Sequence, residues 1–182
     1  MKSTAFTTLL FCFLTTLAFG QSSKIQVDWA KTFGKGTDDM ANDIIRDSDN
    51  NFVICGVTKP KGDKSKDLDV IKLDQFGKLV WGKKYGKGGN DEANCLVEAF
   101  EGGYIVAGSS SLRGSRSNVL GLLKLNKHGD QIWARTYPEI YGRERGAVAK
   151  NIINTSDRGY LVVGHTRELQ SDAFVIKFNQ YG

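Results

Sequence analysis

The sequence is poor in proline, cysteine and histidine, with 2, 3 and 2 of these among its 182 residues. Neither proline falls inside a segment that we predict to be a strand, so every predicted strand keeps its full set of ladder donors. No nucleophile, base and orienting acid occur in a recognisable order, and no glycine-rich loop precedes a helix. These absences argue against triad hydrolysis and against phosphate cradling. We therefore expect no enzyme activity, no cofactor and no metal site.

The N-terminal residues have the pattern of an export signal. Lys2 is followed by an apolar segment, 5–19, and the closing letters "AFG" place small residues at the −3 and −1 positions of a cleavage site. The apolar segment is shorter than the roughly 20 residues that span a bilayer. The sequence thus predicts a signal peptide over 1–20, a mature chain over 21–182 and no membrane span. It predicts an exported protein, located in the periplasm, at the cell surface or in the medium.

Removal of the signal peptide would leave Cys55 and Cys95, which fall in different predicted strands. Export permits a disulfide between them, but sequence spacing alone does not place two Cα atoms within bridging distance. We prefer the interpretation of two small buried thiols. The net charge of +5 is interpreted as an aid to solubility, with weak attraction to anionic glycans or lipid headgroups as the alternative. No nucleic-acid partner is expected.

One strand–turn–strand segment recurs along the chain. The letters "KLDQFGKLVWGKKYGKG" at 72–88 are echoed by "KLNKHGDQIWARTY" at 124–137, and a trace of them occurs as "VDWAKTFGKG" at 27–36. Three tryptophans recur every 52 residues, and so do the first two of three glycines that follow apolar runs. These repeat anchors are Trp29, Trp81, Trp133, Gly56, Gly108 and Gly164. A period of this length predicts stacked copies of one supersecondary unit.

Each copy is predicted to hold four short strands rich in β-branched and aromatic residues, separated by Gly, Asn and Asp. The strands of the first copy are 41–47, 51–58, 68–74 and 78–85. Those of the second copy are 93–99, 103–110, 119–126 and 130–137. Those of the third copy are 149–155, 159–166 and 173–179, with the N-terminal strand 24–33 as the fourth member. No helix is expected beyond the signal peptide.

The second strand of each copy is a nearly continuous apolar run, such as "FVIC" at 52–55 and "YLVV" at 160–163. A sheet with one wet face would alternate apolar and polar residues, so both faces of each unit must be covered. Four-stranded sheets stacked around an axis form a β-propeller, and a flat β-solenoid is the alternative. We predict an all-β propeller of three blades, as a complete or an incomplete ring. The blades cover about 41–86, 93–137 and 149–182, the last completed by strand 24–33.

The motif "W-x-K-x-[FY]-G … A … GY-[IL]-V-x-G … x-[IL]-K-[LF]-[DN]-x-x-G" extends over residues 24–182. It resembles the tandem propeller repeats of secreted bacterial proteins, particularly in the Bacteroidetes lineage. Asp74, Gly77 and Trp81 are also similar to the tryptophan-docked blades of quinoprotein dehydrogenases and of their non-enzymatic scaffold relatives. The carboxylate cluster and the adjacent cysteine pair of the quinone site have no counterpart in the sequence. The resemblance implies a propeller fold with a scaffold role.

Acidic pairs stand before two of the predicted strands, with Asp38 and Asp39 before the first copy and Asp91 and Glu92 before the second. They are candidate ligand-binding groups, because hard cations take several carboxylate or carbonyl oxygens. We prefer the interpretation that each aspartate caps the backbone of its own loop. The tryptophans also have two interpretations, as packing anchors between blades, which we prefer, or as platforms for sugar stacking.

These features predict a non-enzymatic binding or scaffold module that contacts a protein or a glycan through the loops between blades. A fragment of a larger propeller enzyme, quinoprotein-like or glycan-active, is the alternative. Closed propellers typically use four to eight blades, so three blades leave three arrangements open. The chain is a piece of a longer gene product, or two chains pair head to tail as a homodimeric six-bladed ring, or three blades close a compact ring.

Overall fold

The computed structural model describes residues 26–34, 38–59, 61–86, 88–111, 118–138, 146–167 and 171–182. The chain divides into two units, Met1–Ala30 and Lys31–Gly182. All strands of the described residues belong to the second unit, so the sheets, the core and the cleft discussed below are features of Lys31–Gly182. The described residues form no helix, and none of them offers a long apolar helix that could cross a membrane.

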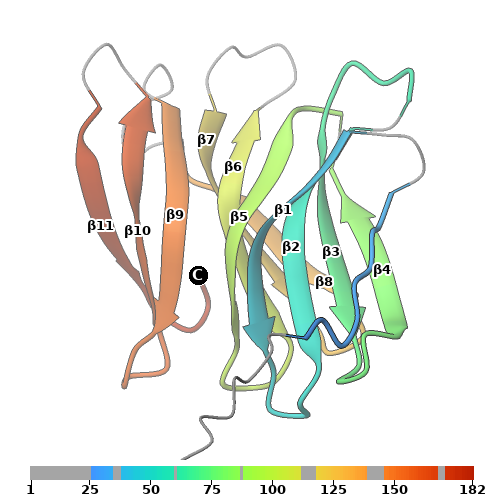
Figure 1. The fold of residues 1–182 in the computed structure, drawn as a ribbon. Coiled ribbons are helices and arrows are strands. Elements are labelled where there is room, and N and C mark those ends of the chain that lie inside the picture. Colours follow the sequence, from blue (N-terminus) through green and yellow to red (C-terminus); the bar gives the residue numbers. More distant parts are fainter. Residues whose placement is uncertain are drawn as a thin grey trace, which may run out of the picture. The chain divides into compact units, whose positions relative to one another are not determined.

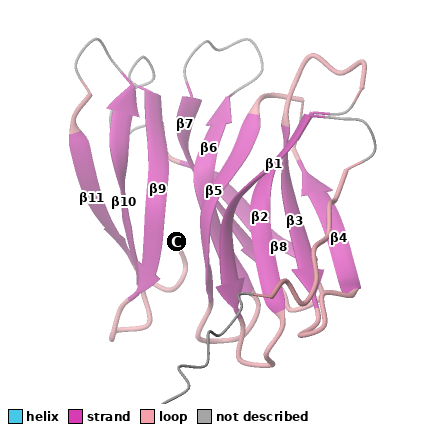
Figure 2. Ribbon diagram, in the orientation of Figure 1, coloured by secondary structure: helices cyan, strands magenta, loops and turns pink. Residues whose placement is uncertain are grey.

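Three antiparallel sheets follow one another along the chain (Figures 1 and 2). The first has the order β1-β2-β3-β4, formed by β1 (Asp38–Arg46), β2 (Phe52–Lys59), β3 (Asp67–Leu73) and β4 (Leu79–Tyr85). The second has the order β5-β6-β7-β8, formed by β5 (Asp91–Glu98), β6 (Tyr104–Ser111), β7 (Asn118–Leu125) and β8 (Gln131–Thr136). The third has the order β11-β10-β9, formed by β9 (Gly146–Asn154), β10 (Tyr160–Arg167) and β11 (Ala173–Phe178).

The predicted all-β fold is confirmed, and each strand predicted between residues 41 and 179 is present. The first strand of each sheet begins two or three residues earlier than predicted. In β1 these extra residues pair with the end of β2, Asp38 with Lys59 and Asp39 with Thr58. A partner strand with free ladder groups therefore extends β1 past its apolar part, which residue propensity alone does not predict.

The first strand of every sheet carries a β-bulge opposite a glycine, which is Gly56, Gly108 or Gly164. The two backbones approach closely at this point. A Cβ added to Gly56 would lie 1.9 Å from the carbonyl oxygen of Met40, and one added to Gly108 would lie 1.8 Å from that of Glu92. A larger residue would push the strands apart. The three glycines predicted as repeat anchors therefore stand where a side chain does not fit.

The extra residue of the bulge reaches the neighbouring sheet. The side-chain amide of Asn42 donates to the carbonyl oxygen of Ala93 at 2.7 Å, and that of Asn94 donates to the carbonyl oxygen of Ala149 at 3.0 Å. These two bonds join the first strands of successive sheets and use backbone carbonyl oxygens next to the bulges as acceptors. Lys150 stands at the corresponding position in β9.

The second sheet lies between the other two and is covered on both faces (Figure 1). The cluster shared with the first sheet contains Val53, Cys55, Val70, Ala93, Leu96, Tyr104, Val106, Leu123 and Leu125. The cluster shared with the third sheet contains Cys95, Ile105, Ala107, Leu120, Leu122, Ala147, Ala149, Ile152, Tyr160, Val162, Phe174 and Phe178. Alternate residues of β6 point to opposite faces, so residues 104–109 are all buried. Two covered faces explain the continuous apolar run in this strand.

The strand predicted at 24–33 as the fourth member of the third sheet is not observed over residues 26–33, and residues 24 and 25 lie outside the described residues. Residues 26–33 of that segment carry no strand, and β9, β10 and β11 are the members of the third sheet within the described chain. The letters "IQVDW" alternate as in a strand with one buried face. An alternating sequence forms a strand only where a neighbouring strand supplies hydrogen-bond partners. None of the three sheets includes residues 26–33.

Cys55 and Cys95 are both free and buried, which confirms the preferred interpretation of two thiols. The two thiols lie in different core clusters. Cys55 belongs to the cluster between the first and second sheets, and Cys95 belongs to the cluster between the second and third sheets. Burial raises the pKa of both thiols, that of Cys95 to about 12. Both side chains therefore stay protonated near neutral pH and act as small apolar groups.

Candidate functional site

A cleft of about 470 Å³ lies between the first and second sheets. One wall comes from the ends of β3 and β4, and the other comes from β5, β6, β7 and β8. The lining includes Leu68, Tyr85, Asp91, Glu92, Gly121 and Leu123. The volume falls within the range of roughly 300–1,000 Å³ that is typical of small-molecule sites.

The cleft is open because a glycine occupies a position where the third sheet has a phenylalanine. Gly121 pairs with Gly108, the glycine opposite the bulge, and both line the cleft. In the third sheet the glycine opposite the bulge, Gly164, pairs with Phe174. A Cβ added to Gly164 would lie 2.5 Å from Cζ of Phe174, so this buried ring lies over the glycine and fills the space between sheets. Gly121 leaves the corresponding space empty.

One end of the cleft is rich in hydrogen-bond acceptors. Asp91 and Glu92 line it, and Oε1 of Glu92 lies 3.1 Å from Nζ of Lys66. Asp67 is close by, since a Cβ added to Gly86 would lie 2.4 Å from an oxygen of Asp67 and 3.1 Å from an oxygen of Asp91. Burial, and then the negative charge of Asp91, raise the pKa of Asp67. This end therefore offers carboxylate oxygens to a donor ligand, with one amine beside them.

The acceptor-rich end is held in place by hydrogen bonds between loops. The hydroxyl of Ser110 donates to Asp91, and the backbone N–H of Asp91 donates to the carbonyl oxygen of Lys66 at 2.9 Å. The side-chain oxygen of Asn90 accepts from the backbone N–H of Lys66 at 3.0 Å, while its carbonyl oxygen accepts from that of Ser111 at 2.8 Å. These bonds connect the β2–β3 loop with the start of β5 and fix the carboxylates before any ligand arrives.

The walls of the cleft are mainly apolar. Leu68 and Leu123 contribute from the facing sheets, and Tyr85 lines the same wall as Leu68 with its hydroxyl donated to a backbone carbonyl of the next sheet at 2.6 Å. Arg135, at another part of the lining, has its guanidinium 5.0 Å from the centroid of the Trp133 ring. The cleft therefore combines apolar walls with polar groups at its rim, as ligand sites usually do.

The four acidic residues predicted as a ligand site do not come together. Asp91 and Glu92 line the cleft, whereas Asp38 and Asp39 lie at the start of β1 and are not part of its lining. Across the described ranges, no group of three or more His, Cys, Asp or Glu side chains is arranged to hold a metal ion. The cleft thus holds one of the two acidic pairs, and a ligand-binding role for the four residues stays a prediction.

Two of the three repeat tryptophans cover turns of a neighbouring sheet. A Cβ added to Gly129, which has a φ of 76°, would lie 2.9 Å from Trp81, whose indole N–H donates to a backbone carbonyl of the same turn at 3.2 Å. A Cβ added to Gly182, with a φ of 81°, would lie 2.6 Å from Trp133. These contacts fit the packing interpretation, because the rings lie on protein. Trp29 is 43% exposed and belongs to the first unit.

No known protein family matches the sequence, and no curated protein matches it. The resemblance to secreted propeller repeats therefore rests on the sequence motif alone and stays a prediction.

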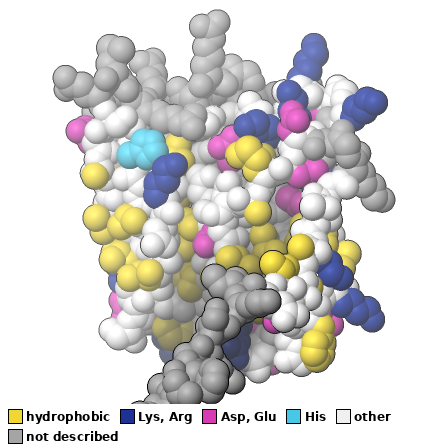
Figure 3. Space-filling view, in the orientation of Figure 1, with side chains coloured by type: hydrophobic (Ala, Val, Ile, Leu, Met, Phe, Trp, Pro, Cys, Tyr) yellow, Lys and Arg dark blue, Asp and Glu magenta, His cyan; other side chains and the backbone are white. Residues whose placement is uncertain are grey.

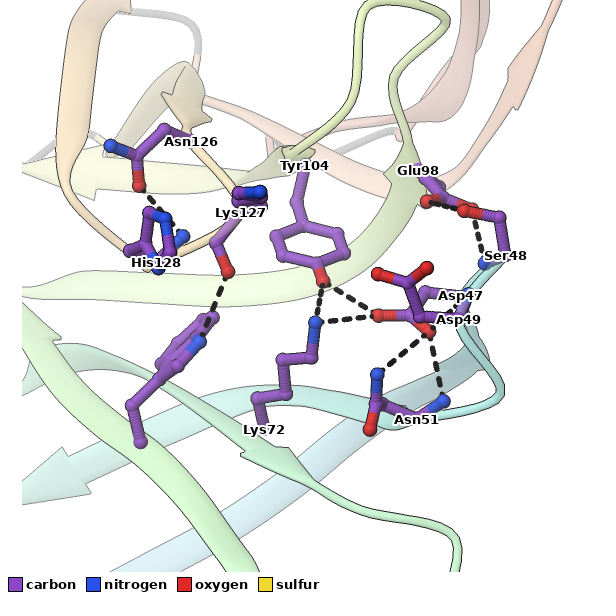
Figure 4. Close-up of polar contacts among 11 residues, drawn as sticks. Asp47, Ser48, Asp49, Asn51, Lys72, Glu98, Tyr104, Asn126, Lys127 and His128 are labelled. Carbon is purple, nitrogen blue, oxygen red and sulfur yellow. Dashed lines mark hydrogen bonds and ion pairs between the residues drawn. The ribbon is translucent and has the colours of Figure 1, made fainter.

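Sequence reasoning missed a buried polar cluster between the first two sheets (Figure 4). Nζ of Lys72 lies 2.8 Å from Oδ2 of Asp47 and donates to the hydroxyl of Tyr104 at 2.9 Å, and that hydroxyl donates to Asp47 at 2.8 Å. The side chains of Lys72 and Asp47 are 8% and 1% exposed. A signal existed, because a lysine recurs at the same point of an apolar strand at Lys124 and Lys177.

Asp47 and Lys72 of this cluster keep their charges near neutral pH. Burial alone would raise the pKa of Asp47, but hydrogen bonds from Lys72, from the backbone of Asn51 and from Tyr104 outweigh it and lower that pKa. Burial alone would lower the pKa of Lys72, but hydrogen bonds with Asp47 and Tyr104 outweigh it and raise that pKa. Burial raises the pKa of Tyr104 to about 12. All three groups titrate far from neutrality, so the cluster ties two sheets together and is unsuited to acid–base catalysis.

Proposed function

We propose that the protein is an exported, non-enzymatic binding module built from propeller-type blades, which holds a glycan segment in the cleft between its first and second sheets. The blade architecture is supported by the common antiparallel strand order, by the glycines opposite the bulges and by the tryptophans that cover turns of the next sheet. The signal-peptide pattern of residues 1–20 supports export.

The observation that carries the proposal is the open space beside Gly121 with Asp91 and Glu92 at its rim. A sugar presents hydroxyl groups at its edge and apolar C–H groups on its ring faces. The carboxylates accept hydrogen bonds from hydroxyls, and Tyr85 and Leu68 supply apolar surface for the C–H groups. A glycan matches this combination of acceptors and apolar walls better than an anionic ligand, which the carboxylates would repel.

A titration of the isotope-labelled protein with a panel of neutral hexasaccharides, followed by heteronuclear NMR, tests the proposal. We expect at least one member to shift the amide signals of Glu92, Ser110 and Gly121. Asp91→Asn should weaken this binding about tenfold or more, because it removes a charged acceptor of a kind that contributes roughly 1.5–3 kcal/mol. The matched control is Asp49→Asn, at an exposed turn residue outside the lining, which should leave the affinity unchanged.

A second variant tests the space itself. A Cβ added to Gly121 would meet only ordinary contacts, the nearest at 3.7 Å, so Gly121→Phe should fold with its ring in the cleft, as Phe174 fills the space beside Gly164. We expect this variant to lose the glycan-induced shifts while its unfolding transition stays cooperative. Full binding by a folded Gly121→Phe variant would exclude the cleft as the site. Release of shorter sugars during the titration would support the glycan-active enzyme instead.

A further inference from the structure

The third sheet turns an apolar face away from the second sheet. Leu161 pairs with Ile153 and Lys177, and Val163 pairs with Val175, so these five side chains share one face. We call them the outer face of the third sheet. Ile153, Val163 and Val175 are 53%, 37% and 67% exposed, and Figure 3 shows hydrophobic side chains gathered where β9–β11 lie. A contiguous apolar group of this kind indicates a contact surface.

The same ladder positions are buried in the other two sheets. Counting from the glycine opposite the bulge, the pair Val163–Val175 corresponds to Cys55–Val70 in the first sheet and to Ala107–Leu122 in the second. These four counterparts are at most 2% exposed, because the next sheet along the chain covers them. The third sheet therefore has the face that receives a following sheet, and in the described residues it stands open.

The first sheet presents the complementary face. Its pair Ile44–Ile54 corresponds to Leu96–Val106 in the second sheet and to Ile152–Val162 in the third. These four counterparts are at most 4% exposed, because each packs on the preceding sheet. Ile44 is 55% exposed and Ile54 is half-buried. We call Ile44 and Ile54 the outer face of the first sheet.

The polar groups at the two outer faces also match. Lys72 relies on the hydroxyl of Tyr104 from the next sheet. Lys177 has its own partner, since its Nζ lies 2.7 Å from Oδ2 of Asp157 in the same sheet. Phe52 in the first sheet corresponds to Tyr104 in the second sheet. Phe52 pairs with Leu73 in the same way as Tyr104 pairs with Leu125. If the two outer faces met, Lys177 would lie opposite Phe52, which has no hydroxyl. Lys177 would not need one, because Asp157 of its own sheet already pairs with it.

We infer that the outer face of the third sheet docks on the outer face of the first sheet of a second copy of this chain. Two such contacts, related by a two-fold axis, join two chains head to tail in a closed ring of six sheets, within the four to eight found in propellers. The partner is another copy because one chain carries both faces and already makes the same packing twice between its own sheets. This inference does not depend on the ligand of the cleft.

Light scattering on a sizing column, applied to the full chain purified after export, tests the inference. We expect the mass of two chains for the wild type over a range of micromolar concentrations. Val175→Lys and Ile44→Lys should each halve this mass, because each places a charge in both contacts of the ring. Ile132→Lys is the matched control, since Ile132 is 58% exposed on β8 of the middle sheet, outside both outer faces. Circular dichroism confirms that each variant is folded.

A mixing experiment separates this contact from any other dimer interface. In a pair of Val175→Lys with Ile44→Lys, one of the two contacts is wild type on both sides, so dimers should reappear on mixing. The inference is overturned if the wild type is a folded single chain, if it is unfolded until further sheets are supplied, or if it forms an open series of larger assemblies. A dimer that persists in Val175→Lys would also overturn it.

Discussion

Two lysines at the same ladder position have opposite surroundings. Lys72 pairs with Val53 in its ladder and Lys124 pairs with Ile105. Lys72 is neutralised by Asp47, whereas Ala99 stands at the corresponding turn position of the second sheet. Nζ of Lys124 is buried and has no hydrogen-bond partner among the described residues, with an oxygen of Glu101 at 4.0 Å. A buried amine stabilises the fold when it is paired and costs free energy when it is not.

The two lysines should therefore respond oppositely to replacement by methionine. Lys72→Met leaves the carboxylate of Asp47 buried without its cation and should cost about 3–5 kcal/mol of unfolding free energy. Lys124→Met removes a buried amine that makes no hydrogen bond to the described residues, and it should stabilise the protein by about 1–3 kcal/mol. Urea unfolding of the two variants beside the wild type measures both effects. Equal destabilisation by the two substitutions would show that Lys124 has a partner in solution.

The stability contributed at Lys124 should depend on alkaline pH. Burial lowers the pKa of Lys124 below its ordinary value of 10.5, so the folded protein releases this proton at a lower pH than the unfolded chain. The penalty for burying the charge is complete below the folded-state pKa and disappears as the pH rises to 10.5. The wild type should therefore gain stability relative to Lys124→Met between pH 7 and 10.5. A difference that stays constant across urea titrations at several pH values would contradict this.

The buried cluster of Asp47, Lys72 and Tyr104 could not be predicted from the sequence alone. Tyr104 lies 32 residues from Lys72 and 57 residues from Asp47 along the chain, and the fold brings them together only when two sheets pack face to face. The opening at Gly121 was hidden for the same reason. A glycine in a strand indicates a bulge or a close approach, but whether it leaves a cleft depends on the side chains that the facing sheet presents.

At the scale of the strands, the glycine opposite each bulge decides whether a sheet can form its first ladder. Gly108→Ala would place a Cβ 1.8 Å from the carbonyl oxygen of Glu92 and should destabilise the protein by at least about 1–3 kcal/mol through overpacking. Gly121→Ala, directly across the ladder, meets no close contact and should stabilise it by about 0.5–1 kcal/mol, because glycine is a poor strand residue. Thermal unfolding compares the pair. A tolerated Gly108→Ala would mean that the bulge is not required.

Strand positions were predictable because each apolar run is short, rich in β-branched residues and bounded by turn residues, as in β6 and β10. The start of β1 at Asp38 was not, since its first residues are held by the ladder with Thr58 and Lys59. The strand expected at 24–33 is not formed over residues 26–33, because these residues lack a partner strand. Its alternating letters resemble a strand, but residues 26–33 have no ladder partner. Pairing, which a sequence does not display, decided both cases.

At the scale of the whole molecule, the same kind of face-to-face contact between sheets occurs twice. It packs the first sheet on the second and the second on the third. Within the described residues, the two faces left without such a neighbour are the outer faces that hold Val175 and Ile44. A three-sheet arrangement with such faces open would be prone to association. We therefore infer that the packing between sheets within one chain continues between two chains.

Isotope-filtered NMR tests this claim most directly. Two samples of the full-length protein, with methyl groups labelled in one and unlabelled in the other, are mixed so that only contacts between different copies give cross-peaks. We expect cross-peaks from Val163 and Val175 of one copy to Ile44 and Ile54 of the other. A wild-type dimer without these cross-peaks, or with cross-peaks that join the third sheets of both copies, would contradict it.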